Sequence, residues 1–261
     1  MVTATLSQTP KVTRTARFAV QTAFEALKRP YQVTPAMALL VALVPLYIFI
    51  PAVLLPGRML YKPALPLDEL LPVWPSWVFV YAALYLFLIV LPVLAVREDE
   101  HIRRTVLAYL FVWVTAYLCF VAFPTLASRP PLLSGANFGT WGLGLLYSAD
   151  PPYNCFPSLH VAHSFVSAFT CYRIHRAVGA ASGAAAFLVG VSTLFTKQHY
   201  LVDVVAGFVL AWVAYLIFLR RYSPARLTQA DRAAVAALAL GLLGLVFSGV
   251  AGAWLLHQWA V

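Results

Sequence analysis

The chain has 261 residues, of which 62% are hydrophobic and only 10% are charged, and its mean hydropathy is +0.82. This composition excludes an ordinary soluble domain and indicates an integral membrane protein. Basic loops beside an anionic leaflet account for the formal net charge of +9, so nucleic-acid binding is not expected.

The basic segment TARFAVQTAFEALKRP, which precedes the first apolar run, is expected to form an interfacial helix. On a helix it places Val20, Phe24 and Leu27 on one face, with Arg14 and Arg17 available to phospholipid head groups. The alternative is a frayed basic tail. No cleavable signal peptide is expected, because the first apolar run has the length of a full span.

Seven apolar runs have the length needed to cross a bilayer, about 17 to 25 residues. They cover residues 34–55, 74–96, 104–126, 160–176, 179–196, 199–219 and 232–256. The sequence therefore predicts an all-α protein with a cytoplasmic segment (1–33), a membrane-embedded core (34–220) and an additional C-terminal span (221–261). The apolar, glycine-rich segment between the third and fourth spans is expected to be a loop along the bilayer surface.

Alternating passage through these spans sorts the basic residues into two unequal sets. Of the 18 lysines and arginines, one side receives only Arg58, Lys62, Arg129 and Lys197. The positive-inside rule makes the richer side cytoplasmic, which puts the amino terminus inside and the carboxyl terminus outside. His160 and His199 then lie at the same membrane level, at the outer starts of the fourth and sixth spans.

The segment KQHYLVDVVAG combines a histidine with a carboxylate. His199 and Asp203 stand at positions i and i+4, so on a helix they share a face one turn apart. An aspartate that accepts from one ring nitrogen leaves the lone pair of the other nitrogen free and stabilises positive charge on the ring. Because ionisable groups within a membrane are costly, this pair indicates a nucleophile or base more than a structural pair.

The segment FPSLH has the features of an anion site. Pro157 ends the preceding loop, Ser158 is a candidate N-cap, and His160 falls in the first turn of the fourth span. The first turn of a helix carries unpaired N–H groups and partial positive charge. Together with Arg129 from the segment ASRPPL, these groups predict a phosphate pocket at the outer surface.

These segments resemble the type 2 phosphatidic acid phosphatase superfamily, whose motifs are K-x6-R-P, P-S-G-H and S-R-x5-H-x3-D. The second motif is present as PSLH, the third has Ser192, His199 and Asp203 in register, and the first is reduced to Arg129 and Pro130. The resemblance covers about residues 129–207. It implies a six-helix core of the kind found in vanadium haloperoxidases, and lipid phosphates such as phospholipids or polyprenyl phosphates as substrates.

Three positions depart from these motifs. Ala122 stands at the family's lysine, Leu159 at its glycine and Thr193 at its arginine. The form PSLH followed by HYxxD is similar to the branch of inositol phosphorylceramide synthases, which transfer a phospho head group between lipids. A monoester brings about two negative charges and a diester one, so the loss of two cations favours the diester, unless Lys197 replaces one of them.

The resemblance implies that His199 attacks phosphorus, that Asp203 orients it, and that His160 protonates the leaving alkoxide. Phosphate binding is expected from four residues: Arg129, Ser158, Ser192 and Lys197. Water as the second acceptor gives a phosphatase, whereas a lipid or sugar hydroxyl gives a transferase. No cofactor or metal ion is expected.

Two other classes of protein remain open at this point. One is a zinc-dependent hydrolase with ligands drawn from His160, His163, His199 and Asp203, although the three cysteines show no metal-ligand spacing. In the expected phosphoryl-transfer enzyme, His163 is a supporting or packing histidine. The other class is a lipid transporter that uses the His–Asp pair as a proton relay.

Overall fold

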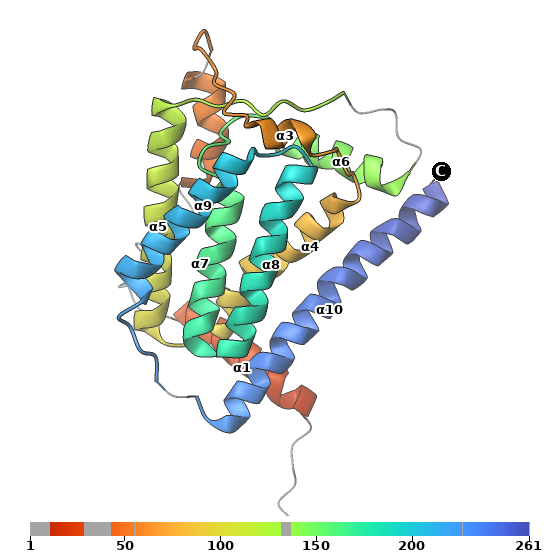
Figure 1. Ribbon diagram of the computed structural model, residues 1–261. Helices are drawn as coiled ribbons and strands as arrows, with labels where there is room; N and C mark the ends of the chain where they lie inside the picture. Colours follow the sequence, from red (N-terminus) through yellow and green to blue (C-terminus); the bar gives the residue numbers. More distant parts are fainter. Residues whose placement is uncertain (1–10, 29–42, 55, 132–136, 226, 261) are drawn as a thin grey trace, which may run out of the picture.

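The computed structural model describes residues 11–28, 43–54, 56–131, 137–225 and 227–260. Within these ranges the chain is helical, and its only extended pairings are two isolated bridges. Figure 1 shows a bundle with α7 (Leu159–Ile174) at its centre. Helix α7 contacts four long neighbours: α4 (Trp77–Ala95), α5 (Asp99–Ala122), α8 (Arg176–Phe195) and α9 (Leu201–Ala214).

The remaining elements surround this group. Helix α10 (Gln229–Ala260) packs on α4, and α1 (Lys11–Lys28) packs on both of them. The π-helical turn η2 (Tyr215–Leu219) continues α9, while η1 (Ile50–Leu54) lies against α5. The short helices α3 (Pro66–Leu70) and α6 (Phe138–Ala149) lie near the end of the bundle where α7 and α9 begin (Figure 1).

Among the described residues, five helices are long and apolar enough to cross a membrane: α4, α5, α8, α10, and α9 together with η2. They correspond to five of the seven predicted spans. The fourth, α7, has 16 residues and is short for a span. The first extends into residues 34–42, outside the described ranges, and its described part is an apolar helix over Leu43–Leu54. The count of seven stays a prediction.

The basic amino-terminal segment is a helix, α1, and one of its side chains is buried in the bundle. Phe18 is 3% exposed, and the guanidinium of Arg97 lies 4.7 Å from the centre of its ring. Val20, from the predicted apolar face, is exposed, while the side chains of Phe24 and Leu27 lie outside the described part. Phe18 therefore anchors α1 to the protein, and the placement of α1 at the membrane surface stays a prediction.

The segment between α5 and α7 was expected to be a loop, and this expectation is wrong for α6. Asn137 caps α6 by accepting a 2.9 Å hydrogen bond from the backbone N–H of Thr140. The rings of Phe79 on α4 and Phe138 stack with centroids 4.0 Å apart. Packing on α4 thus stabilises a helix whose glycines lower its intrinsic propensity.

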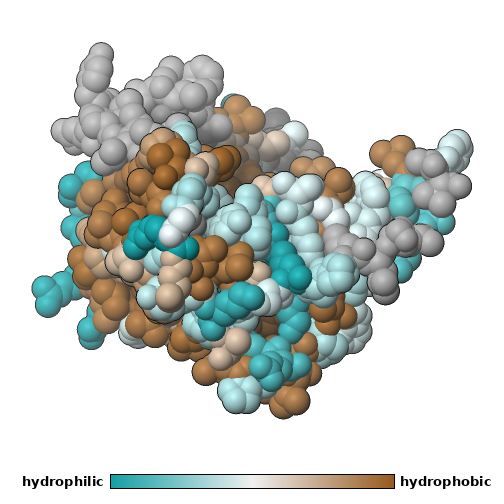
Figure 2. Space-filling model, turned by 90° about the horizontal axis from the view of Figure 1, so that it is seen from above, coloured by the Kyte–Doolittle hydropathy of each residue, from teal (hydrophilic) through white to brown (hydrophobic). Residues whose placement is uncertain are grey.

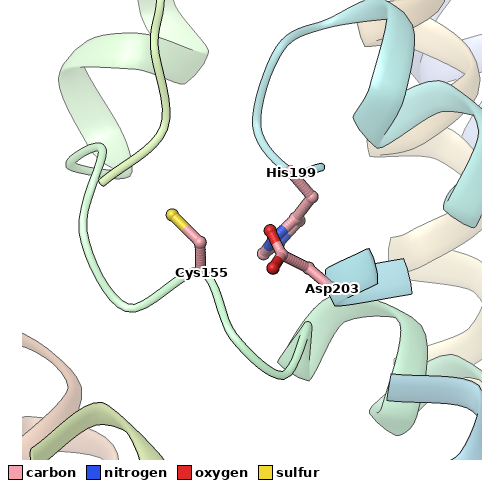
Figure 3. A group of neighbouring side chains, drawn as sticks. All are labelled: Cys155, His199 and Asp203. Atoms are coloured by element: carbon pink, nitrogen blue, oxygen red, sulfur yellow. The ribbon is translucent and has the colours of Figure 1, made fainter. Parts of the chain in front are cut away.

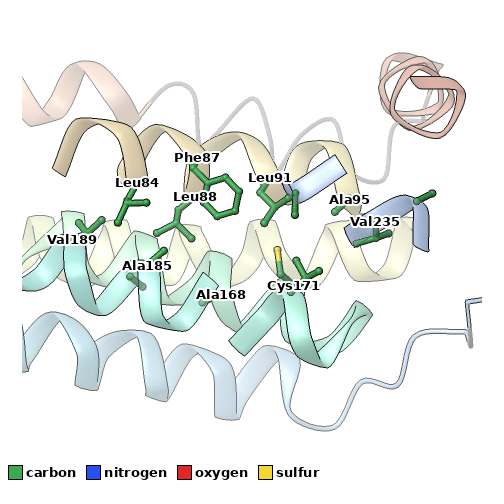
Figure 4. Packing of buried hydrophobic residues seen from close by; sticks show 14 of the residues in the cluster. Leu84, Phe87, Leu88, Leu91, Ala95, Ala168, Cys171, Ala185, Val189 and Val235 are labelled. Atoms are coloured by element: carbon green, nitrogen blue, oxygen red, sulfur yellow. The ribbon is translucent and has the colours of Figure 1, made fainter. Parts of the chain in front are cut away.

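Small residues let the central helices approach closely. Figure 4 shows Leu84, Leu88 and Leu91 of α4 directed toward Ala168 of α7 and Ala185 of α8. Helices in a bilayer associate through such close van der Waals contact, because lipid tails remove most of the hydrophobic driving force. The result is a tightly packed centre that fixes where the ends of α7, α8 and α9 lie.

We call the end of the bundle where α7 begins the histidine end, and the end where α7 turns into α8 the arginine end. Viewed from the histidine end, hydrophilic and hydrophobic residues are intermixed across the middle of the face (Figure 2). The 16 residues of α7 separate the two ends by about 24 Å.

Candidate active site

Two histidines meet at the histidine end. His160 is the second residue of α7, and His199 lies in the turn between α8 and α9. The Nδ1 atom of His160 and the Nε2 atom of His199 are 3.1 Å apart, and both side chains are largely buried. Two imidazoles that are distant in the sequence thus share one hydrogen bond.

His199 was expected on the sixth span, but it precedes α9, which begins at Leu201. Even so, its Nδ1 atom lies 3.4 Å from Oδ2 of Asp203, at ion-pair distance but without hydrogen-bond geometry. Oδ2 of Asp203 also accepts a 2.9 Å hydrogen bond from the backbone N–H of Tyr200. The carboxylate therefore fixes the start of α9 and faces one nitrogen of the His199 ring.

The turn that carries His199 is held by the carboxyl end of α8. The N–H of Gln198 donates to the carbonyl of Thr193 and the N–H of Lys197 to that of Leu194, at 2.9 and 3.2 Å, which is a Schellman motif. Lys197 occupies its left-handed position, with φ of 52°. Glycine is usual there, and a side chain costs about 1–2 kcal/mol. The ammonium of Lys197 offsets this cost by donating to two carbonyls, of Asp68 and Leu71, at 2.8 and 2.7 Å.

Ser158 caps α7, as the sequence predicts. Its hydroxyl accepts from the N–H of Val161 at 3.3 Å, and its own N–H donates to the carbonyl of Asp203 at 3.0 Å. A Cβ at Gly207 of α9 would lie 2.5 Å from the Ser158 carbonyl oxygen, a distance that packing does not allow. Glycine at position 207 therefore permits the contact between α7 and α9 that brings the histidines together.

Arg129 lies between the segments that carry the two histidines. It donates to the carbonyl of Asp150 at 2.6 Å and to the side-chain oxygen of Gln198, and its guanidinium stacks 4.5 Å from the ring centre of Tyr147. Its Nε is buried and has no partner within the described ranges. One donor of Arg129 is thus unused beside the residue that precedes His199.

Comparison with known proteins identifies the family of this chain. A family model described as PAP2 superfamily matches residues 65–217, more than half of the chain. This chain belongs to the PAP2 superfamily. A PA-phosphatase related-family protein of Dictyostelium discoideum is 37% identical over 60 residues, 23% of this chain. The chain covers only 11% of that relative's length. No solved structure matches the chain.

The sequence analysis of this PAP2 superfamily member missed one carboxylate beside the histidines, that of Asp150. Its Oδ2 lies 3.9 Å from Nε2 of His160, and its Oδ1 accepts a 2.8 Å hydrogen bond from the hydroxyl of Tyr47. The signal was present, because the chain has only nine acidic residues and this one interrupts an apolar segment. In each histidine, one ring nitrogen therefore contacts the other histidine and the second ring nitrogen faces a carboxylate.

Ser192 and Lys197, two of the four residues expected to bind phosphate, make other contacts in the structure. Ser192 is fully buried in the last turns of α8, and its hydroxyl donates to the carbonyl of Val189 at 2.7 Å. Within the described ranges, no hydrogen bond links it to either histidine. Lys197 is bound to α3, as described above, yet it lines a cavity with His199.

This cavity has a volume of about 340 Å³ and opens beside His199. Its lining includes both signs of charge and two side-chain hydroxyls. The lining residues are Lys62, Ala64, Asp68, Glu69, Ala127, Ser128, Leu194, Lys197, His199 and Tyr200. It offers a space of head-group size, lined by polar and apolar residues, next to the His199 imidazole.

The metal ligands considered from the sequence do not form one group. Within the described residues, the set with metal-ligand spacing is Cys155, His199 and Asp203, whose ligand atoms lie within 4.8 Å of one another (Figure 3). His163 instead stacks on Tyr109, with ring centroids 4.3 Å apart. Burial, the largest cause, raises the pKa of the Cys155 thiol to about 12. At neutral pH this thiol is protonated, so binding a metal ion would require it to lose a proton.

Proposed function

We propose that this protein is a membrane enzyme that removes or transfers the phosphate-bearing head group of a lipid through a phosphohistidine intermediate. The observation that supports this most directly is the 3.1 Å contact between His160 and His199, with a carboxylate behind each ring. Membership of the PAP2 superfamily supports activity on lipid phosphates. The metal-free form of this chemistry is part of the proposal.

The two carboxylates favour one protonation state for the reaction. If Nδ1 of His199 carries its proton toward Asp203, Nε2 presents a lone pair, and His160 donates to it from Nδ1. His160 then faces Asp150 with Nε2, which favours a proton there as well. To be the acid of the pair, His160 must first become an imidazolium, and the Asp150 carboxylate beside Nε2 favours that form.

In the first half of the reaction, Nε2 of His199 attacks phosphorus while the bond to the leaving oxygen breaks. His160 gives that oxygen a proton, and the products are a lipid alcohol and phosphohistidine. In the second half, neutral His160 takes a proton from water or an alcohol, whose oxygen attacks phosphorus and releases His199. Because attack needs nitrogen and phosphorus about 3–3.5 Å apart, substrate binding must part the two rings.

Arg129, Ser158, Ser192 and Lys197 are proposed to stabilise the phosphoryl oxygens. Arg129 has the strongest claim, because its buried Nε has no partner in the described part of the chain. The N-terminus of α7, which Ser158 caps, adds partial positive charge. Lys197 would need to leave the carbonyls of Asp68 and Leu71 to reach the substrate.

A transferase of phosphodiester head groups is the second candidate. Ala122 and Thr193 stand where the family's motifs have a lysine and an arginine, so the site has fewer cations for a doubly charged monoester. The cavity beside His199, which has two side-chain hydroxyls in its lining, gives an acceptor alcohol a place to bind. We also propose, from the uneven distribution of basic residues, that the histidine end faces away from the cytoplasm.

Product analysis tests the proposal. The purified protein is supplied with phosphatidic acid, phosphatidylinositol or a polyprenyl diphosphate, with and without an alcohol acceptor, and the lipid products are identified by mass spectrometry. Free phosphate alone supports the hydrolase, and a new phosphodiester supports the transferase. Turnover that a chelator abolishes would support a metal enzyme instead, and the absence of turnover on all three lipids would contradict both candidates.

A further inference from the structure

A second cavity among the described residues lies at the arginine end, far from the histidines. It has a volume of about 680 Å³. One wall is the turn from α7 to α8, and the other is the segment that leads into α10. The lining residues are Tyr172, Arg173, Ile174, His175, Arg176, Ala177, Ser223, Pro224, Ala225, Leu227 and Arg232. About 24 Å of α7 separates it from His160, so it is not part of the site described above.

Three arginines and a histidine face this cavity, and no carboxylate lines it within the described ranges. Two other arginines at this end share one carboxylate. Arg103 and Arg104 both bind Glu100, at 2.8 and 2.6 Å. Topology alone requires basic residues at this end but not their convergence on one cavity, so the convergence indicates an anionic ligand.

Arg173 is the most buried of the three arginines. Its Nη2 donates to the carbonyl of Tyr222, while its Nε is buried without a hydrogen-bond partner in the described part of the chain. On the other wall, Nε of Arg232 donates to the carbonyl of Leu227 at 3.3 Å. The contact of Arg173 joins the first wall to the segment that leads into α10, and both arginines still have guanidinium N–H groups available, since each guanidinium has five.

Glu98 is the carboxylate that could compete for these cations, and it is already occupied. It accepts from the hydroxyl of Tyr222 and, at 2.7 Å, from the N–H of Ala225. Glu98 therefore binds the segment that contains Ala225, and it is not among the residues that line the cavity. Asp231, the neighbour of Arg232 in the sequence, also has other partners. Its Oδ1 lies 3.7 Å from Nη2 of Arg14, and its Oδ2 accepts a hydrogen bond from the hydroxyl of Thr228.

We propose that this cavity is a second anion site, which binds a phosphate group at the arginine end. Guanidinium groups bind phosphate in the forked geometry that a point charge cannot offer, which suits the three arginines. The phosphate belongs either to the head group of an anionic lipid or to a free phosphate in solution. The site is independent of the reaction proposed at the histidine end and stands if that reaction is wrong.

Binding of dioctanoyl phosphatidic acid to the full-length protein tests this site. All variants carry His199→Ala, so that the ligand is not consumed. Arg176 and Arg232 are exposed, and R176Q/R232Q should weaken binding by about tenfold or more at about 0.15 M salt. The matched control is R220Q/R221Q, which removes two exposed arginines that do not line the cavity and should change affinity less than about threefold.

Equal losses in the two double variants would mean diffuse surface attraction and would overturn the proposal, as would no loss in either. Competition by inorganic phosphate would identify free phosphate as a ligand, whereas binding of phosphatidic acid without such competition would identify the lipid head group.

A second measurement does not depend on the variants. In the protein with native arginines, phosphatidic acid should slow hydrogen exchange at the amides of Ser223, Ala225 and Leu227, which line the cavity. Unchanged exchange at these amides under saturating ligand would overturn the proposal.

Discussion

At the histidine end of α7, the two histidines and their carboxylates are largely buried and each faces a specific partner, whereas at the arginine end three arginines and a histidine surround a cavity. His199 is 6% exposed and lies between Asp203 and His160, while Arg176 and Arg232 are exposed. Buried groups cannot be screened by water, so a small displacement changes their energy strongly. Single substitutions should therefore have large effects at the histidine end and smaller effects at the arginine end.

The largest effect is expected from His199→Ala. Loss of the nucleophile should lower the turnover of lipid phosphate by at least about 10³-fold, because the remaining groups bind substrate without a bond-forming atom. The measurement is product release from the purified, folded variant. His163→Gln is the matched control, three residues from His160 on α7, and should keep most of the activity. If His199→Ala kept a tenth of the turnover of the unsubstituted protein, the assignment of His199 as the nucleophile would be wrong.

A smaller loss is expected from Asp150→Asn. Removing the charge behind His160 should lower kcat by about 100-fold and leave KM nearly unchanged, because Asp150 supports proton donation and does not bind substrate. A p-nitrophenyl phosphate ester tests the mechanism, because p-nitrophenolate can leave without being protonated. On that substrate the defect should largely disappear. An equal defect on both substrates would show a structural role alone.

Gly207→Ala tests the contact between α7 and α9 that brings the two histidines together. The added Cβ would meet the Ser158 carbonyl at 2.5 Å, and overpacking of this kind costs about 1–3 kcal/mol. Thermal unfolding in detergent should show a lower Tm. Gly183→Ala on α8 is the control, since a Cβ there meets nothing within 4 Å. Equal Tm values for the two variants would contradict the close contact.

The smallest effect is expected from Cys155→Ala. Although its sulfur lies within reach of His199 and Asp203, burial raises the pKa of this thiol to about 12, so it is neutral at pH 7 and has no role in the proposed reaction. Activity should stay within about twofold of the unsubstituted protein. Bound metal measured by elemental analysis should not change. A loss of metal and activity together would support the zinc alternative.

Sequence patterns predicted the structure best where the membrane restricts which residue types can occur at a position. Five of the seven predicted spans appear as helices long enough to cross, because length and apolar content decide that property locally. Ser158 caps α7 as predicted, and His160 and His199 lie together. Helix α6 was missed, because contacts with α4 stabilise it more than its own glycine-rich sequence does.

The amino-acid sequence by itself determined the membrane class, the motif residues of the PAP2 superfamily and their order along the chain. Only the tertiary structure decided that His199 sits in a turn before α9, that Asp150 faces His160, and that Lys197 is bound to α3. Hydrophobic length and helix capping act within a few residues and can be read locally. Contacts such as that of Asp150 join segments through the packing of α7 against its neighbours, which no local pattern records.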